Sequence, residues 1–106
     1  MPGTKLASGA RLTPFAFEEI TVSTAAIGFT AATFKPSGQT PAAYAYVTVE
    51  TNGIRWRTDG SDPTSSVGHA LAAGGTLELA GKTELTNFRA IRSGGADAAL
   101  KVTFYR

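Results

Sequence analysis

The chain of 106 residues contains no cysteine, one histidine, one tryptophan and one methionine. The lack of cysteine excludes disulfide bonds, thiolate nucleophiles and thiolate metal ligands. Ten basic and eight acidic residues give a net charge of +2, too small a surplus to predict nucleic-acid binding. No apolar run approaches the roughly 20 residues that span a bilayer, and the N-terminus lacks the apolar core of a signal peptide. We therefore expect synthesis in the cytoplasm, with no membrane anchor and no encoded export signal.

The apolar residues that are present alternate with polar ones in short runs separated by turn residues. Residues 42–50 show the clearest two-residue period, and residues 98–105 repeat it. The length suits one hydrophobic core, and turn signals recur every 8 to 12 residues or so. The pattern predicts an all-β fold, a single small antiparallel β-sandwich of seven or eight strands, immunoglobulin-like or jelly-roll-like. Strands are expected at 15–22, 25–34, 42–50, 54–58, 76–80, 85–92 and 98–105.

The boundaries of these runs, and the turn residues between them, predict an N-terminal arm, a β-bulge and a hairpin. Residues 1–14 hold two prolines and two glycines with little periodicity, which predicts a flexible N-terminal arm before a domain at 15–106. The alternation changes parity at Glu18-Glu19, which predicts a β-bulge there. Asn52-Gly53 predicts a hairpin between the runs on either side. The alternation assigns these core residues: Phe17, Ile20, Val22, Phe29, Val47, Val49, Ile54, Trp56, Leu77, Leu79, Phe88, Ile91, Leu100, Val102 and Phe104.

The stretch 54–71 holds the only Trp, the only His and the densest turn chemistry. Asp59-Gly60 and Asp62-Pro63 must end a strand and reverse the chain, because Gly accepts positive φ, Pro fixes φ and Asp side chains bond nearby amides. His69 is expected to hydrogen-bond a backbone carbonyl and hold this loop closed. The alanine-rich residues 67–73 are expected to form at most one short helical turn.

Catalytic chemistry has few candidates in this chain. Ser65, His69 and Asp59 lie too close along one loop to converge with the geometry of a catalytic triad. The two loop aspartates lack the alternating ligands and terminal Glu of a calcium loop, so turn formation explains them better. The glycine pairs lack the Lys-Ser/Thr and helix of a phosphate loop. We expect a protein that is not an enzyme and has no cofactor and no metal.

Four side chains are candidate partner contacts. Arg55 and Arg57 lie opposite Ile54 in the alternation, and the predicted hairpin would place Tyr44 and Tyr46 on the same outward face. Tyr and Arg are enriched at protein interfaces. An ordinary solvated sheet face explains these side chains about as well. Among functional interpretations, a protein interface comes first.

A set of segments along the chain carries a resemblance: Val49-Glu50-Thr51, residues 54–57, Asp59-Gly60 with Pro63-Thr64, Gly68-His69, residues 88–92 and residues 98–106. Together these segments resemble a group of small tailed-phage proteins of about this length. The resemblance implies a virion accessory role, such as a capsid decoration or cement protein or an adaptor at the head, tail or fibre, and carries over no catalytic residue. The expected partners are further copies of the chain and the major capsid protein or another virion protein, without nucleic acid or membrane. The expected location is the virion.

A shorter segment resembles a different family. Residues 58–66, TDGSDPTSS, are similar to a motif in the C-terminal immunoglobulin-like domain of chitobiases and related sugar-active enzymes. This resemblance implies a carbohydrate-binding accessory module as the alternative function, with sugar as a partner only in that case. Sugar binding needs exposed aromatic residues. Trp56, in phase with Ile54, is expected in the core instead.

Overall fold

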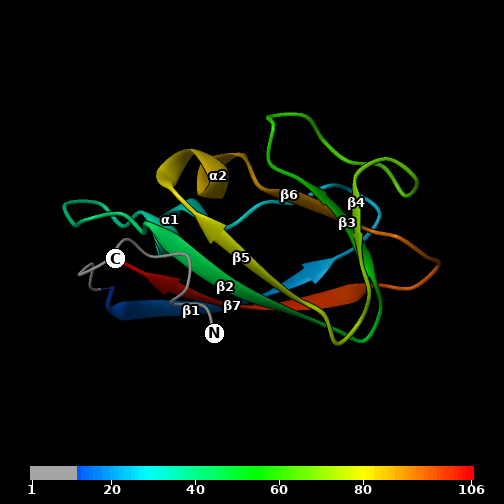
Figure 1. The fold of residues 1–106 in the computed structure, drawn as a ribbon, viewed down its shortest axis with the longest axis horizontal. Coiled ribbons are helices and arrows are strands. Elements are labelled where there is room, and N and C mark those ends of the chain that lie inside the picture. Colours follow the sequence, from blue (N-terminus) through cyan, green and yellow to red (C-terminus); the bar gives the residue numbers. More distant parts are fainter. Residues whose placement is uncertain (1–11) are drawn as a thin grey trace.

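A computed structural model describes residues 12–106 of the chain as two antiparallel sheets packed around one core (Figure 1). The strand order is β1-β7-β2-β5 in the four-stranded sheet and β4-β3-β6 in the three-stranded sheet. The predicted small antiparallel β-sandwich is therefore confirmed. Within the described part of the chain, no helix is long and apolar enough to cross a membrane. The elements are β1 Pro14–Val22, α1 Ala31–Phe34, β2 Tyr44–Glu50, β3 Ile54–Arg57, β4 His69–Leu71, β5 Thr76–Ala80, α2 Lys82–Asn87, β6 Arg89–Arg92 and β7 Ala98–Tyr105.

The core lies between the sheets, and aromatic rings fill its centre. Phe29 stacks on Phe88 with ring centroids 4.5 Å apart and meets Phe104 edge to face at 5.1 Å. Each fully buried ring contributes about 1.5–3 kcal/mol of transfer free energy, so these contacts dominate the packing. The buried apolar cluster consists of Ile20, Val22, Phe29, Phe34, Ala42, Ala45, Val47, Val49, Ile54, Leu79, Leu85, Phe88, Ala90, Ala98, Leu100, Val102 and Phe104.

The hairpin predicted at Asn52-Gly53 is wrong. Strand β2 pairs with β5 and β7, whereas β3 pairs with β4 and β6, so residues 51–53 carry the chain from one sheet to the other. Thr51 adopts a positive φ of 72° at this corner, and the side-chain amide of Asn52 donates a hydrogen bond of 2.9 Å to the backbone carbonyl of Asp97. The Asn-Gly pair does mark a change of chain direction. The strands on either side of it nevertheless belong to different sheets, and each turns its apolar face toward the core between the sheets.

Two predicted strands are partly replaced by short helices. Residues 25–34 form one isolated bridge, Ile27 to Ala90, followed by α1. Residues 85–92 begin inside α2 and become β6 only at Arg89. In α2, Leu85 is fully buried and the Glu84 carboxylate accepts a hydrogen bond of 3.1 Å from the Ala80 amide. Each short helix has one buried apolar residue, Phe34 in α1 and Leu85 in α2, which leaves no periodicity that the sequence pattern can reveal. The alanine-rich residues 67–73 contain strand β4 rather than a helical turn.

The irregularity in β1 lies near its start and not at the glutamate pair. The register with β7 shifts between Pro14 and Ala16 and is regular from there to Val22. Phe17 therefore faces outward with 58% of its surface exposed, so its assignment to the core is wrong. Three other predicted core residues are only half-buried: Trp56, Leu77 and Ile91.

The start of the described chain joins the sheet. Thr13 and Arg106 exchange two backbone hydrogen bonds of 2.8 and 3.0 Å, and β1 begins at Pro14. Arg106 also lies over the Phe15 ring, 4.1 Å from its centroid. The predicted arm at 1–14 thus ends in ordered residues, and residues 1–11 lie outside the described part.

Candidate interaction surfaces

The predicted contact residues divide between the two outer faces of the sandwich. Tyr44 and Tyr46 belong to β2 in the four-stranded sheet, and Arg55 and Arg57 belong to β3 in the three-stranded sheet. Because outer faces of a sandwich point away from each other, the two pairs do not form one surface. The error follows from the wrong hairpin.

All three tyrosines of the chain lie on the outer face of the four-stranded sheet. Tyr44 is opposite Tyr105, and their rings meet edge to face with centroids 5.4 Å apart. Only 3% of Tyr44 is exposed, so its prediction as a surface contact is wrong. Burial, and next a hydrogen bond with Glu78, raise the pKa of the Tyr44 hydroxyl well above its usual value. Tyr46 is half-buried and lies in the same cross-strand row as the exposed Phe17.

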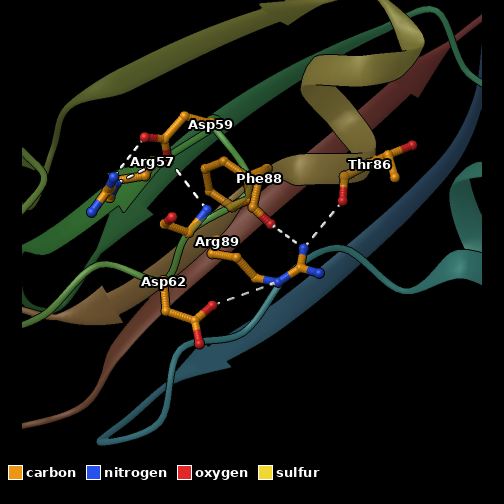
Figure 2. Close-up of polar contacts among 7 residues, drawn as sticks. Arg57, Asp59, Asp62, Thr86, Phe88 and Arg89 are labelled. Carbon is orange, nitrogen blue, oxygen red and sulfur yellow. Dashed lines mark hydrogen bonds and ion pairs between the residues drawn. The ribbon is translucent and has the colours of Figure 1, made fainter.

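Three arginines lie on the outer face of the three-stranded sheet, and we call this surface the arginine face: Arg55, Arg57 and Arg89. Arg57 lies directly opposite Arg89, an arrangement in which like charges destabilise a sheet. The loop after β3 supplies the compensating carboxylates (Figure 2). Asp59 accepts two hydrogen bonds from Arg57, at 2.9 and 2.5 Å, and Asp62 lies 4.0 Å from Nε of Arg89. The guanidinium of Arg57 holds the pKa of Asp59 below its usual value.

The loop at 58–68 folds against this face. Pro63 is buried, and a Cβ at Gly68 would lie 3.1 Å from the Pro63 side chain. Gly68 has a φ of 132°, which L side chains rarely adopt. Its carbonyl accepts a hydrogen bond of 3.1 Å from Nη1 of Arg55. Pro63 and Arg55 therefore help to hold the loop that Asp59-Gly60 and Asp62-Pro63 were predicted to form.

His69 has a different role from the one predicted. Its ring lies 4.7 Å from the Trp56 ring, between centroids, at the start of β4. Among residues 12–106 its imidazole makes no hydrogen bond, so a side-chain bond to a backbone carbonyl is not what holds the loop. The same part of the chain holds no group of three His, Asp or Glu side chains that could bind a metal ion.

A further surface feature, which we call the basic groove, was missed by the sequence reasoning. This groove of about 500 Å³ lies between residues 26–31, the end of α1 and the end of α2. Ile27, Phe29 and Phe34 give it an apolar lining, and Lys35 and Arg89 supply its cations. The Glu18 carboxylate lies at its edge, where it accepts a hydrogen bond of 3.0 Å from the amide of the lining residue Thr30. Its position could not be predicted, because the pattern of residues 85–92 indicates one continuous strand and hides helix α2.

Arg89 is fixed in position by the backbone around it. Its Nη1 donates hydrogen bonds to the carbonyls of Thr86 and Phe88, at 3.1 and 2.7 Å, and so caps the end of α2 (Figure 2). The guanidinium lies so close to Gly28 that a Cβ there would be 2.5 Å from Nη1. In Figure 2 the other terminal nitrogen points away from Asp62. Arg89 thus contributes to both the arginine face and the basic groove.

The geometry gives a rigid scaffold with an exposed aromatic residue on one face, an arginine face on the other and a basic groove beside α1. Comparisons with protein-family models, curated proteins and solved structures found no match for this chain.

Proposed function

We propose that this chain is a non-enzymatic structural protein of a tailed-phage virion, a capsid decoration or cement protein or a head or tail adaptor, acting through protein–protein contacts. The observation that carries the proposal is Phe17. This side chain is 58% exposed on a regular strand, in the same cross-strand row as the half-buried Tyr46, which lies on β2 beyond the intervening strand β7. An exposed aromatic residue on a sheet surface favours contact with another protein.

The segments that resemble the phage proteins support the same proposal. They form β3 and β6, the loop at 58–68 with the start of β4, the end of β2, and β7. These elements build most of the three-stranded sheet. They also include β7, one of the two central strands of the four-stranded sheet. The resemblance therefore covers strands of both sheets. The outer faces of these sheets present the side chains proposed for contact.

Mass spectrometry of purified virions tests this proposal. Many copies of the chain per particle are expected, and its absence from washed particles would refute the virion role. The carbohydrate alternative predicts instead that Tyr46→Ala abolishes binding on a glycan array. We favour protein contact because Trp56 packs against the core and its ring is covered by His69 on one side.

A further inference from the structure

The basic groove combines an apolar lining with two cations. Ile27 is 40% exposed within it, while Phe29 and Phe34 are almost fully buried beneath. The side chain of Arg89 is 40% exposed, and its nearest carboxylate, Asp62, is 4.0 Å away and itself 72% exposed. Arg89 is therefore only loosely neutralised. An apolar floor beside two cations is chemically suited to a segment that carries an aromatic side chain next to a carboxylate.

The described chain presents such a segment on β1. Phe17 and Glu19 are two residues apart, so both project from the outer face of the strand. Phe17 is 58% exposed, and the Glu19 side chain is 62% exposed. Glu19 makes one ion pair of 2.8 Å, with Lys101, at the surface, where such pairs are readily exchanged.

We propose that the basic groove binds β1 of a second copy of this chain, with Phe17 against Ile27 and the phenylalanine floor and Glu19 between Arg89 and Lys35. The inference rests on the proposed function, because it identifies how a self-associating structural protein contacts itself. The two surfaces are different, so the contact is heterologous. It closes into a dimer when each of two copies places the outer face of its β1 in the groove of the other. It closes into a ring when each copy binds the next in the same direction.

Sedimentation velocity on the full chain, over a wide range of concentrations, tests the contact. We expect wild-type protein to self-associate and Phe17→Ala to raise the dissociation constant at least tenfold. Val67→Ala is the matched control, because Val67 is also an exposed large apolar residue (51%) but lies on the loop at 58–68. A wild-type chain that stays monomeric would overturn the proposal, as would equal weakening by the two substitutions.

A charge exchange tests the polar half of the contact. Glu19→Lys and Lys35→Glu should each weaken association, and the double variant should recover part of it, because opposite charges then meet again at position 35 while Arg89 remains cationic. Lys82→Glu, with the same change of charge on α2 outside the groove, should leave association unchanged. No recovery in the double variant, with all variants folded by circular dichroism, would overturn the proposed pairing.

The two proposals can fail separately. A chain abundant in virions but monomeric at high concentration would refute the contact and leave the virion role. A chain that self-associates through Phe17 but is absent from particles would refute the virion role and leave the contact.

Discussion

Replacing Gly28 with alanine should destabilise the fold by moving Arg89 away from the end of α2. The new Cβ would lie 2.5 Å from Nη1 of Arg89 and 2.7 Å from the Phe88 carbonyl oxygen. The second distance is about 0.7 Å inside the 3.4 Å at which ordinary contact begins. The guanidinium can rotate away, but the carbonyl belongs to the backbone between α2 and β6, so that backbone must shift.

Two terms set the size of this effect. Forcing an extra carbon into a packed site costs about 1–3 kcal/mol. Displacing Arg89 also loses its hydrogen bonds to the Thr86 and Phe88 carbonyls, at about 1 kcal/mol or more together in this partly exposed position. We therefore expect the free energy of unfolding to fall by about 2–3 kcal/mol. At a typical slope of about 2 kcal/mol per molar urea, the midpoint falls by roughly 1–1.5 M.

Urea unfolding followed by the fluorescence of Trp56 measures this change, because the indole packs against the core. Gly94→Ala is the control. A Cβ at Gly94 meets nothing within 4 Å, and its φ is not in the left-handed region, so stability should change by less than about 0.5 kcal/mol. In an Arg89→Ala background the cost of Gly28→Ala should fall by about 1 kcal/mol. Equal cost in both backgrounds would refute the coupling to Arg89.

Three further predictions follow from buried or paired groups. Leu85→Ala should lower the free energy of unfolding by about 2–5 kcal/mol in thermal or urea unfolding, because Leu85 is fully buried; a loss below 1 kcal/mol would mean that α2 is not docked. Gly68→Ala should cost more than about 1 kcal/mol, since alanine does not tolerate its φ of 132°, and a neutral result in the same assay would contradict the described loop. Hydrogen bonds from Ser23 and then Arg92 lower the pKa of Asp97, so its contribution to stability is present above its unfolded pKa near 3.9 and is lost as the pH falls through the folded value. Asp97→Asn should therefore destabilise at neutral pH, with the difference shrinking below about pH 4; a difference independent of pH would exclude the charge of the Asp97 carboxylate as the cause.

The fold class could be predicted because strand alternation is a local signal. Val47, Val49, Leu100 and Val102 all face the core as the period of two requires. The sheet order could not be predicted in this way, because pairing depends on which strands share a buried layer. Asn52-Gly53 illustrates the difference: the turn chemistry was identified, but the strands it joins belong to different sheets.

The candidate surfaces were predicted only in part, for the same reason. Arg55 and Arg57 face outward as expected, because alternation within one strand fixes this. Arg89 was missed because its position depends on α2, a helix of six residues with one buried leucine. Phe17 was placed in the core because the bulge predicted at Glu18-Glu19 would put it in phase with Ile20, whereas the strand is regular from Ala16 onward and the two side chains point to opposite faces.

The position of β7 has a consequence for how the chain reaches its fold. This last strand lies between β1 and β2, so β1 has no strand partner, and β2 has only β5, until residues 98–105 are available. On the ribosome, the larger sheet therefore cannot close until these residues have left the exit tunnel. Non-local pairing of this kind makes folding slow, on the order of milliseconds to seconds. In a nascent chain stalled before residue 98, residues 14–22 should remain sensitive to protease, because β1 pairs only with β7.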